Sequence, residues 1–200
     1  MDIDSVYFHR IGIPSSRSPP GQLSGPLQQD RSSTKSNDYL NLFPGHDTEM
    51  GLRNAAKALI RREDKILVTE NTDDKGLWYI LPGGGMEPCK ETLLGSLKRE
   101  CKEEIGTDVE VEDLEYVREY ITDNYPDSWS KGGHLVDFIF RCSVPEGYDP
   151  SQAPDGDSMQ VGVKWMRVSE LKRRRFYPRA LLSHLEAGPK SSTVYLGDVT

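Results

Sequence analysis

The sequence has 200 residues, which is long enough for one compact domain with a buried core. Hydrophobic residues make up 36% and charged residues 28%, a composition typical of a polar globular protein, and no stretch has the length of apolar sequence that a membrane span needs. The formal net charge of -7 argues against a protein that grips a nucleic-acid duplex, because that requires clustered Lys and Arg. A small phosphorylated ligand remains compatible, since bound cations can offset its charge.

The cysteines Cys89, Cys101 and Cys142 form an odd set without metal-binding spacing, and no secretory signal precedes them. We therefore expect reduced thiols and a cytoplasmic protein. The sequence leaves open whether the protein is a monomer or a homodimer.

Residues 1–49 differ in composition from the rest of the chain. The segment 15–38 is rich in Ser, Pro, Gly and Gln, and it has too few large apolar side chains to offset the entropy of ordering it. We predict a flexible low-complexity leader over residues 1–49 and one folded domain over residues 50–200.

Short β-like runs separated by turn residues begin after Leu52. They predict a hairpin, a third strand that stops at a glycine-rich bend, a helix from about Glu91 to Ile105, further strands and a second helix within Pro178 to Leu185. The predicted strands are Ala55 to Ile60, Lys65 to Thr69, Trp78 to Leu81, Val109 to Val111, Leu114 to Ile121, His134 to Val144 and Val161 to Val168. This order indicates an α+β fold.

The first predicted helix has an apolar sector and an acidic sector. At roughly 100° per residue, its apolar side chains share a sector of about 120° that we expect to face the core. They are Leu93, Leu94, Leu97, Cys101 and Ile105. Glu100, Glu103 and Glu104 occupy an adjoining arc. Like charges at this spacing repel, and a hard divalent cation such as Mg²⁺ would remove the repulsion.

The bend before this helix reads Leu-Pro-Gly-Gly-Gly-Met-Glu, from Leu81 to Glu87. Glycine lets a backbone carbonyl or amide approach a ligand without a side chain in the way. Such a turn taken alone is usually only a turn, and an acidic helix taken alone is usually a solvated surface.

Together, the bend and the helix resemble the Nudix box. In that pattern a Gly, five residues, a Glu and seven residues precede Arg-Glu-U-x-Glu-Glu-x-Gly-U, where U is a bulky aliphatic residue. Here the pattern begins at Gly85, continues at Glu91 and ends with residues 99–107, and every Gly, Glu and Arg is in register. The departures are Cys101 and Thr107 at the two U positions, which are small enough to be buried.

The resemblance implies the Nudix fold, an α/β/α sandwich around a mixed β-sheet. It implies a hydrolase that uses Mg²⁺ or Mn²⁺ to cleave a phosphoanhydride (pyrophosphate) bond in a nucleoside diphosphate derivative. The competing interpretation is a Nudix-fold module that binds or senses a nucleotide without cleaving it. Such modules usually lose the carboxylates of the box, which this sequence retains.

Roles for the residues of the box follow from the resemblance. Glu100 and Glu104 are expected to ligate the cation, with help from Glu103 and from the carbonyl of Gly85. Arg99 is expected to orient the carboxylates, as a planar guanidinium can. Glu91 is expected to anchor the box to the fold.

The general base is either Glu103 or an acid in a later loop, such as Asp157. The small-molecule nucleotide substrate is an ADP-ribose-like compound, a dinucleoside polyphosphate or a nucleoside triphosphate. Tyr125 lies near a position where a tyrosine accompanies dinucleoside polyphosphate activity in the family. Several aromatic side chains are candidates for stacking on a base, although a core or surface role is the commoner one for each. They are Trp78, Tyr79, Tyr125 and Trp129.

Overall fold

The computed structural model describes residues 52–126, 128, 131–154, 159–187 and 194–200. The predicted leader over residues 1–49, and the candidate residues Trp129 and Asp157, lie outside these ranges. Within the described ranges, no helix has both the length and the apolar character that crossing a membrane requires.

The described strands form one mixed sheet in the order β7-β3-β2-β1-β5-β4-β8, and β6 pairs with β2 outside this path. Three pairs are parallel, namely β1 with β5, β3 with β7, and β4 with β8, and the other pairs are antiparallel. The strands are β1 (Leu52–Arg62), β2 (Lys65–Asp73), β3 (Gly76–Ile80), β4 (Glu110–Ile121), β5 (His134–Ser143), β6 (Gln160–Arg167), β7 (Phe176–Tyr177) and β8 (Tyr195–Asp198).

The sheet divides into two halves because β1 and β2 pair only beside their turn, at Arg61 and Arg62. Beyond that point β2 pairs with β3 and β6, while β1 pairs with β5. The edge of β1 that β2 leaves is taken by the glycine-rich bend. The amide of Ala56 donates to the carbonyl of Gly84 at 2.9 Å, and that of Ala58 donates to the carbonyl of Pro82 at 2.8 Å. The bend is therefore fixed to β1 by backbone hydrogen bonds.

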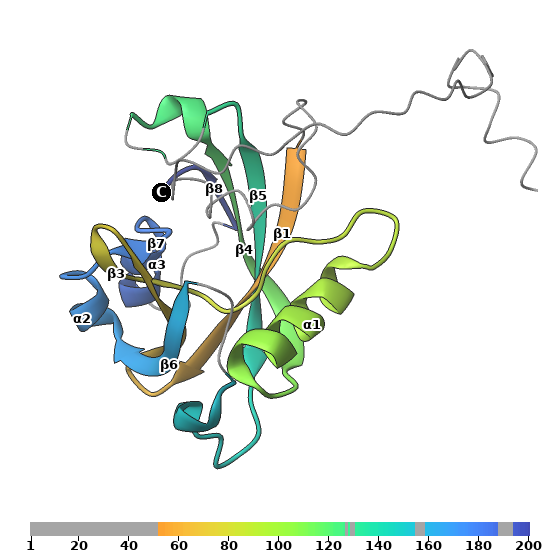
Figure 1. Ribbon diagram of the computed structural model, residues 1–200, viewed down its shortest axis with the longest axis vertical. Coiled ribbons are helices and arrows are strands. Elements are labelled where there is room, and N and C mark those ends of the chain that lie inside the picture. The colour runs from red at the N-terminus through yellow and green to blue at the C-terminus, as the bar shows by residue number, and fades with distance from the viewer. Residues whose placement is uncertain (1–51, 127, 129–130, 155–158, 188–193) are drawn as a thin grey trace, which may run out of the picture. The chain divides into compact units, whose positions relative to one another are not determined.

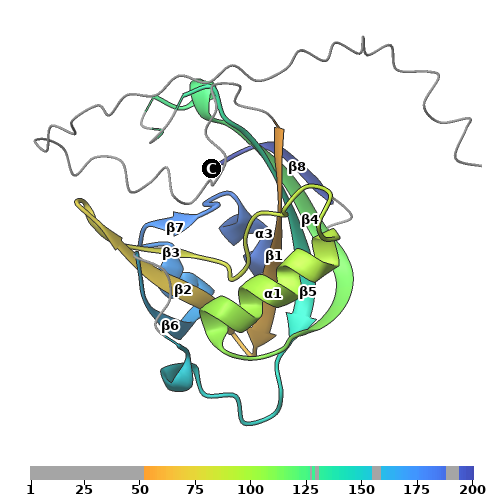
Figure 2. The same cartoon turned by 45° about the vertical axis from the view of Figure 1, so that its right-hand side comes forward.

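Helices cover both faces of the sheet, as Figures 1 and 2 show. The helices are α1 (Leu93–Ile105), α2 (Val168–Leu171) and α3 (Leu181–Ala187). On one face, Leu97, Cys101 and Ile105 of α1 pack in a core cluster with alanines of β1. On the other face, Leu171 of α2 and Leu181 of α3 join a second cluster. The predicted α+β sandwich around a mixed sheet is confirmed.

Helix α1 begins two residues later than predicted, because the side chain of Thr92 caps it by accepting a hydrogen bond from the amide of Gly95. It ends at Gly106, whose φ of 73° lies in the left-handed region that glycine adopts readily. The prediction that Leu94 faces the core is wrong, since this side chain is exposed. Leu94 lies in the first turn, before the buried positions that start at Ser96.

The two strands predicted after α1 are one strand, β4, with register shifts on either side of Leu114. A bulge lets one strand continue past residues that break the alternation of side chains. The strands β7 and β8, which are only 2 and 4 residues long, were not predicted from the sequence.

A buried ion pair joins β4 to β5. Both Nε and Nη2 of Arg118 bond Oδ2 of Asp137, at 2.7 and 2.6 Å, and Nη1 donates to the carbonyl of Val199 at 2.7 Å. The two side chains are only 6% and 2% exposed. Removing one partner of such a pair leaves a buried charge without its counter-ion.

We expect Arg118→Met to lower the free energy of unfolding by about 3–5 kcal/mol, because it leaves the buried carboxylate of Asp137 without its counter-ion. Urea unfolding measures the change. Arg141→Met is the matched control, because Arg141 pairs with Glu112 and Asp113 at the surface, and we expect it to cost less than about 1 kcal/mol. Equal losses in the two variants would contradict the assignment.

Thiol reactivity tests the packing under α1. Burial raises the pKa of Cys142 to about 12, and burial raises the pKa of Cys101 further, while Cys89 is exposed. Because the thiolate is the reactive form, we expect a thiol reagent near pH 8 to modify Cys89 rapidly in the folded protein and all three cysteines only after unfolding. Rapid modification of Cys101 in the folded protein would show that α1 does not pack as described.

Candidate active site

The three glycines of the bend are each held by a different donor or acceptor. The amide of Gly83 donates to Oε2 of Glu104 at 2.7 Å, and its carbonyl accepts a hydrogen bond from Nζ of Lys57. The carbonyl of Gly84 is bound by β1, and that of Gly85 accepts a hydrogen bond from Nη2 of Arg99 at 3.3 Å. The bend is therefore tied to both β1 and α1.

Two of these positions require glycine for different reasons. A Cβ on Gly83 would lie 2.3 Å from the carbonyl oxygen of Ala56, and the φ of +112° disfavours any side chain. A Cβ on Gly84 would lie 2.4–2.6 Å from the carboxylate of Glu100. Gly83 thus allows the bend to lie on β1, and Gly84 leaves the space that the carboxylate of Glu100 occupies.

The guanidinium of Arg99 binds the two acidic parts of the box to each other. Nε and Nη2 donate to both oxygens of Glu91, at 3.1 and 2.8 Å. Nη1 donates to Glu100 at 2.8 Å and to Glu103 at 3.2 Å. These contacts raise the pKa of Arg99, with the hydrogen bonds to Glu91 as the largest cause, and the same bonds hold the pKa of Glu91 below its usual range.

The three helical carboxylates differ in their surroundings. The side chain of Glu100 is 20% exposed and that of Glu103 is 60% exposed. Glu104 is half-buried, with its carboxylate on the amide of Gly83 and its own carbonyl bound by Nε2 of Gln160 at 2.8 Å. Among the described residues, no group of three or more His, Cys, Asp or Glu is arranged as a ready-made metal site.

The structure brings the predicted box residues together around the bend. Glu100 and Glu103 share Arg99, Glu104 contacts Gly83, and Gly85 is bound by Arg99. Glu91 accepts hydrogen bonds from Arg99 and from the amide of Glu87, at 2.8 and 2.9 Å. Of the two departures from the box pattern, Cys101 is buried and Thr107 is half-buried.

The aromatic candidates among the described residues each have a partner outside the box. Tyr79 is a core residue whose hydroxyl donates to Glu70 at 2.9 Å, so it offers no stacking face. Trp78 meets Tyr177 edge to face, with ring centroids 6.4 Å apart. Tyr125 stacks on Tyr120 with centroids 5.1 Å apart.

Two cations of β1 contact the bend and were not predicted as site residues from the sequence. Lys57 binds the carbonyl of Gly83, and the guanidinium of Arg53 lies against Gly85, where a Cβ would come within 2.1–2.6 Å of its atoms. Arg53 and Lys57, four residues apart, share one face of a strand that otherwise consists mainly of alanine and aliphatic residues, but the sequence does not indicate which groups they contact. Such charges inside a buried strand need partners.

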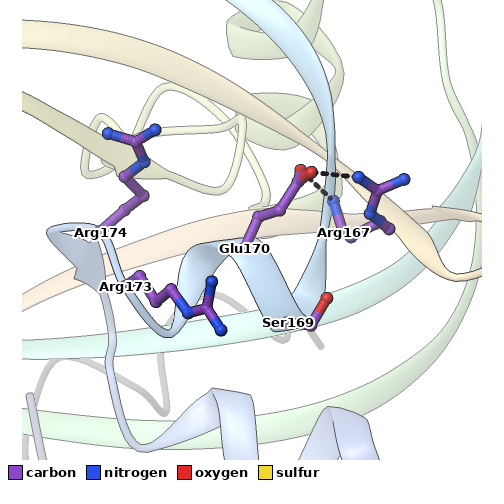
Figure 3. Close-up of a pocket in the computed structure, with 5 residues that line it drawn as sticks. All are labelled: Arg167, Ser169, Glu170, Arg173 and Arg174. Carbon is purple, nitrogen blue, oxygen red and sulfur yellow. Dashed lines mark hydrogen bonds and ion pairs between the residues drawn. The ribbon is translucent and has the colours of Figure 1, made fainter.

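A pocket of about 500 Å³ lies at α2, lined by Arg167, Ser169, Glu170, Arg173 and Arg174 (Figure 3). Glu170 is engaged there by both the amide and the guanidinium of Arg167. None of the box residues lines it. The pocket is therefore separate from the predicted site.

Comparison with known proteins shows which family the sequence matches. Residues 51–184, more than half of the chain, match the NUDIX domain. The chain is 32% identical over 130 residues to 8-oxo-dGDP phosphatase NUDT18 of Danio rerio, covering 64% of this chain and 35% of that protein. It is 32% identical over 134 residues to a MutT-like protein of Streptomyces ambofaciens, covering 66% and 76% of the two chains. The chain thus spans about a third of the length of NUDT18.

Solved structures share the fold. A NUDIX hydrolase from Nitrosomonas europaea superposes with a TM-score of 0.57 at 20% identity, over 72% of this chain and 93% of that one. The ORF135 protein of E. coli gives a TM-score of 0.52 at 21% identity, over 74% of this chain and 100% of that one.

The chain belongs to the Nudix hydrolase family. The enzyme class predicted from the sequence, a pyrophosphohydrolase, is the class to which this membership points.

The two glycines give a test of the site against the fold. We expect Gly83→Ala to lower stability strongly, because its Cβ meets rigid backbone at a positive φ. We expect Gly84→Ala to fold nearly as well as wild type and to lose activity, because its Cβ meets only the movable end of Glu100. Thermal unfolding and a hydrolysis assay separate the two effects. Full activity in Gly84→Ala would mean that the position of Glu100 does not matter.

Proposed function

We propose that the protein hydrolyses a phosphoanhydride bond in a nucleoside diphosphate derivative, with Mg²⁺ or Mn²⁺ bound by the box. The observation that carries the proposal is the position of two carboxylates of α1 against the glycine bend. Glu104 accepts the amide of Gly83, and Glu100 fills the space beside Gly84. A helix and a bend are thus joined so that acidic side chains and backbone groups face one small region.

The residues present suit a hard divalent ion. Carboxylates of Glu100, Glu103 and Glu104 and the carbonyl of Gly85 are oxygen ligands of the kind that Mg²⁺ and Mn²⁺ prefer. A side chain on Gly84 would collide with the carboxylate of Glu100, so glycine lets this carboxylate lie against the bend. When bound, the ion would neutralise charge on the substrate phosphates and acidify a water molecule.

The other residues of the box would orient these ligands. Arg99, fixed by both oxygens of Glu91, holds Glu100 and Glu103 through Nη1. Glu103 is the more exposed of these two carboxylates, so it is the better placed to take a proton from water, and we assign it the role of general base. The alternative base, Asp157, lies outside the described residues.

The proposed substrate class is supported by the name of one relative and by the net charge of the protein. NUDT18 is by its name a phosphatase of a nucleoside diphosphate, 8-oxo-dGDP. For this chain we propose the wider class, which includes ADP-ribose-like compounds and dinucleoside polyphosphates. With its net charge of -7, the protein would meet the phosphates of such a ligand through the metal and a few local cations. The cytoplasmic location belongs to the same proposal.

Carboxylate substitutions test the proposal. We expect Glu103→Gln and Glu104→Gln to lower kcat by about 10²- to 10⁴-fold without loss of fold, because each keeps its shape and loses its charge. The measurement is release of phosphate or nucleoside monophosphate from a panel of nucleotide derivatives. Glu110→Gln, at an exposed position of β4, is the matched control and should keep wild-type activity. Unchanged turnover in both box variants would remove the assignment.

Metal dependence is a separate test. We expect turnover with Mg²⁺ or Mn²⁺ and none with a chelator, and we expect metal returned in excess to restore it. The alternative, a binding or sensor module, requires the opposite pattern. A protein that binds a nucleotide of the panel tightly and hydrolyses none of them with either metal would support that module.

A further inference from the structure

Arg53 lies on β1 with its guanidinium over Gly85, the first residue of the box. A Cβ at Gly85 would be 2.1 Å from Nη2, 2.5 Å from Nε and 2.6 Å from Cζ of Arg53. The guanidinium therefore occupies the side-chain position of Gly85. The carbonyl of the same Gly85 is bound by Arg99. Two guanidinium groups thus meet at one glycine.

A row of paired residues leads from this glycine into the sheet. Gly85 pairs with Ala55 in an isolated bridge, Ala55 pairs with Asp137 of β5, and Asp137 pairs with Arg118 of β4. Paired residues of a sheet point their side chains to the same face. Arg53 is two residues before Ala55, so it shares this face. Glycine and alanine leave room there for a larger group from a neighbouring position.

The carboxylate of Asp137, within this row, has one oxygen without a hydrogen bond among the described residues. Oδ2 of Asp137 accepts both hydrogen bonds from Arg118, whereas Oδ1 is buried without a hydrogen-bond partner among the described residues. A buried acceptor in this state is unusual in a folded protein, since leaving one unsatisfied costs about 1–3 kcal/mol. Asp137 can therefore hold a cation next to it through Coulomb attraction.

The charges around Arg53 agree with this arrangement. Burial lowers the pKa of Arg53, while Glu100 and Asp137 act in the opposite direction. The arginine thus has an acid of the box and an acid of the sheet within electrostatic reach. A cation held between acids keeps its side chain in one place, and its forked donors match the oxygens of a phosphate.

We propose that Arg53 binds a phosphate of the substrate, and that the buried Asp137 and Arg118 pair positions it beside the box. The inference rests on the proposed function, because the substrate must bring a phosphate to Gly85. A structural role, in which Arg53 only balances two acids, makes a different prediction for ligand binding.

The first experiment measures binding of α,β-methylene-ADP, a diphosphate that cannot be hydrolysed at the bridging position, by calorimetry with Mg²⁺ and with chelator. We expect Arg53→Met to weaken binding by about tenfold or more in both conditions, because a charge-assisted contact is lost. Arg53→Lys should recover only part of the affinity, since it lacks the fork. Arg62→Met makes the same charge change at the far end of β1, and it should bind like wild type.

A second variant displaces Arg53 without removing it. Gly85→Ala keeps the carbonyl of the box and places a methyl group where the guanidinium lies. We expect its binding loss to resemble that of Arg53→Met, and the double variant to lose no more than Arg53→Met alone, because both changes act on one contact. Additive losses would overturn the proposal. This pair remains informative if Arg53→Met itself unfolds, because Arg53→Lys then replaces it in the cycle.

The outcomes separate the two proposals. Binding by Arg53→Met within about twofold of wild type, with an unchanged melting temperature, would show that Arg53 is structural. No binding by the wild-type protein at millimolar ligand would also overturn the inference. If wild type binds the analogue, Arg53→Met weakens it, and no substrate is hydrolysed with either metal, then the proposed hydrolysis fails and the role of Arg53 stands.

Discussion

The guanidinium of Arg99 is the interaction on which the geometry of the box depends. It joins Glu91, which precedes the helix, to Glu100 and Glu103 within it, and it binds the carbonyl of Gly85 in the bend. Three negative charges and a backbone dipole therefore converge on one planar cation. Without that cation, repulsion among the carboxylates would spread them apart, and the loop that leads from the bend into α1 would lose its main tie to the helix. Arg99 therefore balances the charges of the acidic residues of the box from within the box itself.

The sheet supplies the second half of this arrangement. Because β2 leaves β1 after Arg61 and Arg62, the edge of β1 is open to the bend, and backbone hydrogen bonds from Ala56 and Ala58 fix it there. Helix α1 then packs on the alanine face of the same strand. One strand thus positions both the glycines and the acidic helix, so the relative placement of carboxylates and carbonyls follows from the core of the domain.

The fixed spacing from Gly85 to Thr107 made the helix and the placement of Glu100, Glu103 and Glu104 on one side of it predictable, because a helix places residues three and four apart on one side. The fold class followed from the order of strands and helices. Arg53 was beyond reach, because its contact with Gly85 depends on a long-range register between β1 and the bend. Leu94 was predicted to face the core and is exposed. Helical periodicity identifies the apolar side of a helix, but it does not show how far along the helix axis the core extends. The strands β7 and β8 are too short to carry a periodic signal.

The hydrogen bonds between the bend and β1 also protect the protein from self-association. An open strand edge presents unpaired amides and carbonyls that recruit other chains, and natural proteins cover such edges. Here the covering segment is the glycine-rich bend, through the carbonyls of Pro82 and Gly84. Any change that detaches this loop would uncover a β-strand template next to the aliphatic core, so damage to the site and a tendency to self-associate would arise together.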